Sequence, residues 1–195
     1  MLLNKGAMFG LDARIALAIF GTLSVISGVA LYSAIKESKY VSFYTQTQEL
    51  AKAIEQYYLD HQEMLPSFGG TVIDIRYLIE NRDSSKNWNG PYIDCERGST
   101  TDTYGYLYCN GLSNASLSTY IRPYTKDGST LTACTSDDCF IWIFYHVANT
   151  LKPDYQALFY YIDERYDGGD GETSGNIQMS NVSSMYILIK VMPNK

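Results

Sequence analysis

The sequence has few of the residues, and none of the motifs, on which most enzymes depend. It contains two histidines, His61 and His146, and it lacks a Gly-x-Ser-x-Gly, a phosphate-binding loop and a His-Glu-x-x-His motif. It is also poor in basic residues: 15 lysines and arginines stand against 21 acidic residues, and the formal net charge is −6. Surfaces that bind nucleic acids are basic. We therefore predict that the protein is not an enzyme and does not bind nucleic acid, and we interpret both histidines as structural or exposed.

Proline and charge are both missing from a long stretch near the amino terminus. No proline occurs before Pro66, and no charged residue lies among the 21 residues from Ile15 to Ile35. At about 1.5 Å per residue, a helix of this length covers roughly 30 Å, the thickness of the hydrocarbon core of a bilayer. The small residues of a signal-peptidase site do not follow the run. We expect a membrane anchor that is either uncleaved or cleaved ahead of the apolar run, at Gly10.

The helix is predicted to continue beyond the membrane edge. After Tyr40, apolar and aromatic residues recur at alternating steps of four and three, which is typical of one helical face, and the pattern lasts to the end of the proline-free region. We predict one helix over about residues 12–63, with a transmembrane or filament-core half at 11–35 and an amphipathic half at 36–65. The amphipathic face from Tyr40 to Tyr58 either covers a domain core or forms a coiled-coil seam with a neighbour.

Residues 66–195 are predicted to form one globular α+β domain. Runs rich in β-branched and aromatic residues predict strands at Thr103–Cys109, Cys139–Val147 and Met185–Met192. Short helices are expected at about Val72–Asn81 and Pro153–Tyr166, the second because proline suits the first helical turn. The predicted fold class is therefore a long N-terminal helix packed on a small antiparallel sheet.

All four cysteines lie in this globular part. An even number of cysteines beyond a membrane segment indicates disulfides in an oxidising compartment, and four cysteines allow three pairings. We favour Cys95–Cys109 and Cys134–Cys139 because each closes a short local loop. Free buried thiols and a zinc site are the alternatives, but the sequence has no Cys-x-x-Cys pair for zinc. The cysteines, more than the nearly balanced charges around the apolar run, place the C-terminal domain outside the cytoplasm.

The layout as a whole resembles the type IV pilin family, which includes the pseudopilins of type II secretion. The resemblance rests on a short leader ending in Gly10, an apolar run, one continuous helix and a C-terminal domain with cysteines. The segment Asn87-Trp88-Asn89-Gly90-Pro91-Tyr92 is also similar to a Trp-Gly-Pro-Tyr turn of that family. The resemblance implies that residues 1–10 are a leader removed by a prepilin peptidase, and that residues 11–58 assemble copies of the chain into a helical filament.

The start of the mature chain departs from the family pattern at two positions. Cleavage after Gly10 would expose Leu11 in place of the usual phenylalanine, and Ile15 stands where the family usually has a glutamate that pairs with a neighbour's free amine. Asp12 is the nearest carboxylate and is a candidate for that assembly role. Arg14 is a competing partner for Asp12 within the same chain.

An acidic, glycine-rich segment follows the second predicted helix. Residues 163–176 read DERYDGGDGETSGN and resemble the loop in which major pseudopilins bind calcium. Four carboxylates are the candidate ligands, and glycines at 168, 169 and 171 allow backbone carbonyls to point inward: Asp163, Asp167, Asp170 and Glu172. The alternative is a solvated acidic turn without a metal.

Two functions remain open from the sequence. The first is a structural subunit of a pseudopilus or pilus, held in the inner membrane with its C-terminal domain outside the cytoplasm and then assembled, with its secretion machinery, into a periplasmic or cell-surface filament. The second is a monomeric, single-span, membrane-anchored module that binds or adheres to a target. The acidic loop favours the secretion pseudopilin.

Overall fold

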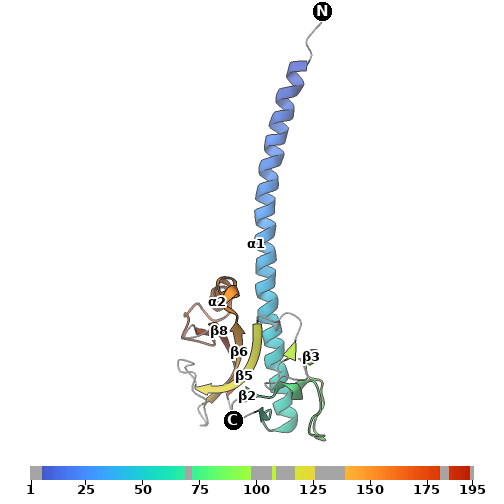
Figure 1. Cartoon of the computed structure of the whole chain (residues 1–195), viewed down its shortest axis with the longest axis vertical. Coiled ribbons are helices and arrows are strands. Elements are labelled where there is room, and N and C mark those ends of the chain that lie inside the picture. The colour runs from blue at the N-terminus through green and yellow to red at the C-terminus, as the bar shows by residue number, and fades with distance from the viewer. Residues whose placement is uncertain are drawn as a thin grey trace, which may run out of the picture. The chain divides into compact units, whose positions relative to one another are not determined.

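The computed structural model describes residues 6–68, 72–97, 107–108, 117–125, 139–180 and 185–193 (Figure 1). Its helical elements are α1 (Gly6–His61), η1 (Ile75–Leu78), η2 (Asn149–Leu151) and α2 (Lys152–Tyr166). Its strands are β1 (Ser67–Phe68), β2 (Val72–Ile73), β3 (Glu96–Arg97), β4 (Leu107–Tyr108), β5 (Leu117–Thr125), β6 (Cys139–Val147), β7 (Ile177–Ser180) and β8 (Met185–Pro193). A long apolar helix with a small antiparallel sheet confirms the predicted α+β fold class.

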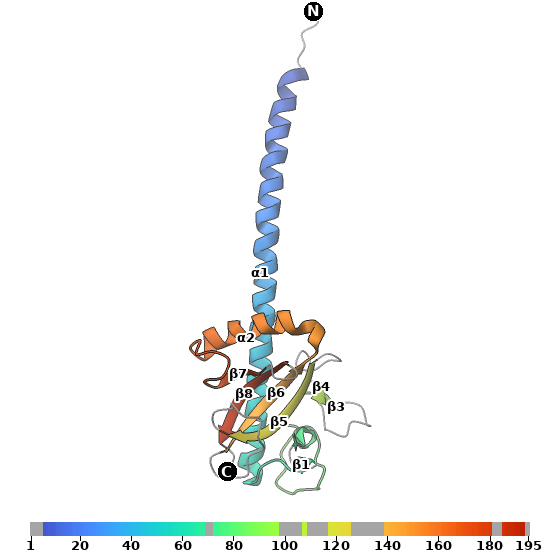
Figure 2. The ribbon, with the colours of Figure 1, turned by 60° about the vertical axis from the view of Figure 1, so that its left-hand side comes forward.

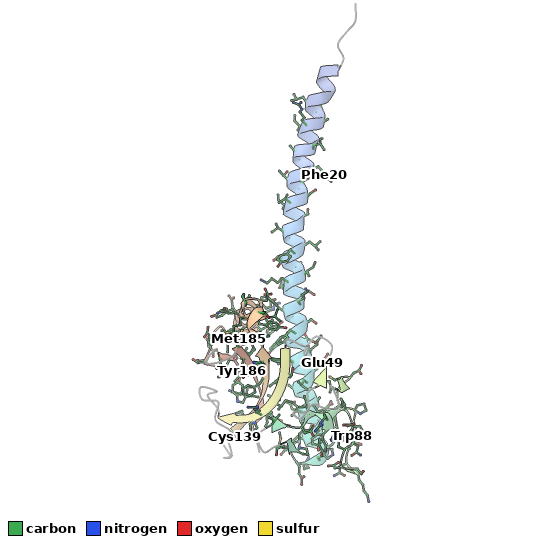
Figure 3. All side chains as sticks on the ribbon, viewed as in Figure 1. Phe20, Glu49, Trp88, Cys139, Met185 and Tyr186 are labelled. Carbon is green, nitrogen blue, oxygen red and sulfur yellow. The ribbon has the colours of Figure 1, made fainter. Side chains whose placement is uncertain are left out.

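The chain divides into two compact units, Met1–Lys39 and Tyr40–Lys195, and α1 contributes residues to both. In the first unit, the apolar run forms an uninterrupted helix because no proline breaks it. Its large side chains are exposed on every side; Phe20, labelled in Figure 3, is 70% exposed. The helix from Gly10 onward has a mean hydropathy of 2.1 in its most apolar window, none of which is buried, and it is long and apolar enough to cross a membrane.

The second unit contains a four-stranded antiparallel sheet in the order β5-β6-β8-β7, with α2 lying across one end of the strands (Figure 2). The central strand β6 is buried on both faces because its run of apolar residues leaves almost no polar position. Successive side chains of a strand point to opposite faces, so Ile141, Ile143 and Tyr145 face one way and Trp142 and Phe144 face the other.

One face of the sheet packs against the second half of α1 and against α2. The main cluster joins Phe43, Leu50 and Ile54 of α1 to Ile143 of β6 and Phe159 of α2. This core confirms that α1 packs on the sheet. It also accounts for the apolar positions between Tyr40 and Tyr58, which favours the core-covering interpretation over a coiled-coil seam.

The predicted helix at Val72–Asn81 is wrong. Val72–Ile73 pairs with Ser67–Phe68 as a short antiparallel ladder, and only Ile75–Leu78 forms a single 3₁₀ turn. Asp74, which is 5% exposed, explains the difference. Its carboxylate accepts a hydrogen bond from the backbone N–H of Arg76 and two more from the Arg76 guanidinium, at 2.7 and 2.6 Å, and this tight local pairing starts a short turn where a regular helix was expected.

Two strands of the four-stranded sheet were not predicted, and neither were the two-residue strands β1, β2 and β3. β5 was missed because its sequence, LSTYIRPYT, is polar and contains Pro123; β5 is an edge strand, where a missing N–H is tolerated. β7 was missed because it has only four residues. The strand predicted at Thr103–Cys109 lies outside the described residues except for β4 at Leu107–Tyr108, whereas the predictions for β6 and β8 match the structure to within one residue.

The turn around Gly90 is hydrogen-bonded to η1 and to the end of α1. The Trp88 indole donates to the carbonyl oxygen of Tyr77 at 2.9 Å, and the Tyr92 hydroxyl donates to Asp60 at 2.8 Å. A Cβ at Gly90 would lie 2.6 Å from the Trp88 ring. Glycine at this position therefore lets the Trp88 and Tyr92 rings close over the backbone.

Candidate functional site

The acidic loop lies between α2 and β7, and the structure brings three of its four predicted carboxylates together. Asp163 lies in the last turn of α2, and Asp167 directly follows the helix, with its backbone N–H bonded to the carbonyl oxygen of Asp163 at 2.9 Å. Gly168, Gly169 and Gly171 follow with φ between 70 and 99°, which turns the chain back and places Asp170 beside them. One carboxylate oxygen from each aspartate lies within 4.8 Å of the others.

Asp163 is the buried member of this cluster. It is 3% exposed; its Oδ2 accepts a hydrogen bond from the Gly171 N–H at 3.3 Å, and its Oδ1 has no hydrogen-bond partner among the described residues. Burial, followed by the charges of Asp170 and Asp167, raises the pKa of the Asp163 carboxyl, against a lowering contribution from the Gly171 N–H. A buried, unpaired carboxylate oxygen is costly unless a cation or a proton compensates it.

Asp167 is held in place by the start of β7. Its carboxylate accepts hydrogen bonds from the backbone N–H groups of Asn176 and Ile177, at 2.5 and 2.6 Å, and from the Asn176 side-chain amide at 3.0 Å. These bonds join the two ends of the loop. They also orient Asp167 before any ligand is present.

Gly175 completes the cluster and was not singled out from the sequence. Its φ is 73°, and a Cβ at this position would overlap Oδ2 of Asp167 and lie 2.6 and 2.7 Å from the two carboxylate oxygens of Asp170. The two carboxylates therefore approach each other over a residue that has no side chain. A fourth glycine in an already glycine-rich acidic segment was the only signal in the sequence.

Glu172 is not brought into the cluster. Its carboxylate accepts a hydrogen bond of 2.6 Å from the Tyr160 hydroxyl on α2, and this bond is the main reason that the pKa of Tyr160 is raised. The structure thus gathers Asp163, Asp167 and Asp170 and directs the fourth predicted ligand elsewhere.

No lysine or arginine among the described residues neutralises the charge of the three aspartates. Within the described part of the chain, no lysine or arginine makes an ion pair with any of them; the ion pairs there join Asp74 and Glu80 to Arg76 and Arg82. Clustered oxygen ligands on a flexible, glycine-rich turn are what hard cations such as Ca²⁺ prefer. The arrangement is chemically suited to hold such a cation.

The predicted processing and assembly residues all lie on α1. A Cβ at Gly10 would have no neighbour within 4 Å, and Leu11 is 63% exposed. Asp12 and Arg14 are exposed and make no ion pair with each other in the described structure, because residues two apart on a helix point to different sides.

Two of the four cysteines belong to the described residues. Cys95 and Cys139 are each disulfide-bonded, and Cys139 is completely buried. Cys109 and Cys134 lie outside the described residues. The pairing Cys95–Cys109 with Cys134–Cys139 therefore stays a prediction.

A long apolar helix, an antiparallel sheet packed on its second half and an aromatic turn at Trp88–Tyr92 are the features expected of the type IV pilin-like class. The family model for protein G of the type II secretion system (T2SS) matches residues 30–138, which is more than half of the chain. The chain belongs to this family, whose members are structural components of a secretion system. No curated protein and no solved structure matches the chain. The family match ends before the acidic loop, so it carries no information about metal binding there.

Proposed function

We propose that this chain is a structural subunit of a type II secretion pseudopilus, stored in the inner membrane and assembled through the first half of α1. The observation that carries this proposal is the exposure of that half. Its large apolar side chains are 47–70% exposed in the described structure: Leu11, Ile15, Leu17, Ile19, Phe20, Leu23, Val25, Ile26, Val29, Leu31, Tyr32 and Ile35.

The free energy cost of leaving this apolar surface in water is large enough that the surface needs a binding partner. Removing one such side chain from water contributes about 1.5–3 kcal/mol, so a dozen of them exceed the roughly 5–15 kcal/mol that stabilises a typical domain. Lipid supplies the first cover. Sister helices supply the second, because packing side chains against each other in place of lipid exposes none of them to water when a subunit moves from membrane to filament.

Removal of residues 1–10 would leave Leu11 with a free α-amine at the end of this helix. Ile15 offers no carboxylate to a neighbour's amine. Asp12 does, and it is exposed and makes no ion pair with any described residue, which supports Asp12 as the residue that pairs with a neighbour's amine. Arg14 is exposed in the same way and would meet acidic groups of a neighbour.

Mass spectrometry of the mature chain tests the proposal. A mass that begins at Leu11, with filaments cross-linked through residues in 11–58, is the expected result. The matched variants are Gly10→Val, which should block processing, and Gly21→Val, which leaves the cleavage position unchanged. An intact Met1 together with a monomer in detergent would favour the alternative, a single-span membrane-anchored binding module.

We also infer that the acidic loop binds Ca²⁺ through Asp163, Asp167 and Asp170. Three features support this: the unpaired buried oxygen of Asp163, the absence of a basic partner among the described residues, and the side-chain-free space over Gly175. Backbone carbonyls and water would complete the six to eight oxygen ligands that Ca²⁺ takes. Bound calcium would supply positive charge that ties α2 to β7.

Isothermal titration calorimetry of the full chain in detergent micelles, after treatment with EDTA, measures this binding. Asp167→Asn and Asp170→Asn should abolish the heat of Ca²⁺ binding. Gly175→Ala should do the same by displacing both carboxylates, whereas Gly168→Ala imposes similar backbone strain at φ 86° with no neighbour within 4 Å and should keep binding. Equal Ca²⁺ affinity of the Gly175→Ala and Gly168→Ala variants would rule out this geometry.

A further inference from the structure

A stacked pair of tyrosines joins α1 to the acidic loop. The rings of Tyr44 on α1 and Tyr166 on α2 lie 3.9 Å apart between centroids with an interplanar angle of 10°. Tyr166 is the last residue of α2 and directly precedes Asp167. Tyr44 also interacts electrostatically with the loop. Burial is the main cause of the raised pKa of the Tyr44 phenol, and the charge of Asp167 is the second.

The stack lies at the exposed last turn of α2. Upstream, Leu158, Phe159 and Ile162 are buried in the core, but residues 164–166 are all exposed. The last turn of α2 must nevertheless hold Asp167 close to Asp163 and Asp170, although three like charges repel one another when no cation is bound. A flat ring on α1 that covers the ring of Tyr166 resists the movement that this repulsion would cause.

We propose that Tyr44 is a positioning residue for the cation site, and that its stacking on Tyr166 couples occupancy of the acidic loop to α1. The proposal rests on the calcium site proposed above. Tyr44 touches no ligand; it fixes the turn from which Asp167 extends. In the reverse direction, a bound cation orders that turn and so fixes Tyr44 on the helix through which the subunit packs.

The strength of the coupling follows from the usual strength of an aromatic pair, which corresponds to about a two- to tenfold change in an equilibrium constant. We expect Tyr44→Ala and Tyr166→Ala each to weaken Ca²⁺ affinity by this factor. The double variant should be no weaker than either single variant, because the two changes remove one contact. Tyr44→Phe, which keeps the ring, should bind as the unchanged chain does.

The control is Tyr58→Ala, on the same helix and about 21 Å further along it, whose ring takes part in no described ring pair. Calcium affinity is measured by calorimetry on the full chain in detergent micelles, and folding of each variant is checked by near-ultraviolet circular dichroism. If Tyr44→Ala does not fold, Tyr44→Leu, which keeps apolar bulk but not a flat ring, replaces it with the same expectation. Ca²⁺ should also shift the ¹³C resonances of the Tyr44 ring, assigned by their loss in Tyr44→Phe.

Each result separates this inference from the calcium site. Weaker binding by Tyr44→Ala together with a calcium-dependent shift of the Tyr44 resonances supports the coupling. Calcium binding by the unchanged chain with equal affinity in Tyr44→Ala overturns the coupling alone, even if that variant is less stable. An unchanged chain that binds no Ca²⁺ overturns the calcium site, and the coupling with it.

Discussion

The hydrogen bond between the hydroxyl groups of Thr47 on α1 and Tyr145 on β6 predicts how strongly substitutions at these two positions lower the free energy of unfolding, relative to one another. Both side chains are 0% exposed, and their oxygens are 2.8 Å apart. Thr47 has a single hydroxyl hydrogen, which it donates to the carbonyl oxygen of Phe43 at 2.9 Å. Tyr145 must therefore be the donor in the pair, and burial raises the pKa of its phenol, which keeps that hydrogen in place.

This donor assignment predicts that the two single substitutions destabilise the protein by different amounts. Tyr145→Phe removes the donor but leaves the Thr47 hydrogen bonded to Phe43, so we expect a loss of about 0.5–1.5 kcal/mol in the free energy of unfolding. Thr47→Val keeps the volume but leaves the Tyr145 hydroxyl buried without an acceptor, at a cost of about 1–3 kcal/mol. The double variant has no stranded group and should lie near Tyr145→Phe.

Urea unfolding of the full chain in detergent micelles, followed by the near-ultraviolet circular dichroism of the aromatic core, measures these differences. The informative quantity is the order of the three variants, because all of them share one reference state. If Thr47→Val proves less destabilising than Tyr145→Phe, or if the double variant equals the sum of both, the donor assignment is refuted.

Three further predictions concern the acidic loop, the apolar run and the aromatic turn. The pKa of Asp163 is raised in the folded chain, so above about pH 4 the folded state binds more protons than the unfolded state. The stability of the calcium-free chain should therefore fall as pH rises through the raised pKa. Thermal unfolding with EDTA measures this pH dependence, and Asp163→Asn should flatten it. Leu23→Arg places a charge in the middle of the apolar run at an insertion cost of about 2.5–3.5 kcal/mol and should reduce the share of chain that resists alkaline extraction from membranes, relative to Leu23→Ala. Gly90→Ala forces a Cβ to within 2.6 Å of the Trp88 ring and should lower the free energy of unfolding by about 1–3 kcal/mol; an unchanged urea midpoint would contradict that contact.

The elements that could be predicted are those whose local sequence pattern is enough to specify their secondary structure. α1 follows from a proline-free start and an apolar pattern that never breaks, and β6 from a run of β-branched and aromatic residues. The segment Val72–Asn81 could not be predicted in this way, since its conformation depends on a buried carboxylate–guanidinium pair and on a partner strand. β5 likewise forms a strand because it pairs with β6 at the edge of the sheet, where the missing backbone N–H of Pro123 is tolerated.

The acidic loop, too, has properties that follow from the sequence and others that only the tertiary structure determines. The sequence determined that carboxylates and glycines are concentrated in residues 163–176, and that an uncharged helix near the amino terminus needs lipid or sister helices as cover; both follow from composition and order along the chain. The tertiary structure alone decided which carboxylates meet, because the C-terminal turn of α2, the return of the chain to β7 and the stack on Tyr44 are set by packing between distant segments. That packing gathers Asp163, Asp167 and Asp170 over Gly175 and turns Glu172 toward Tyr160, a choice that no local pattern contains.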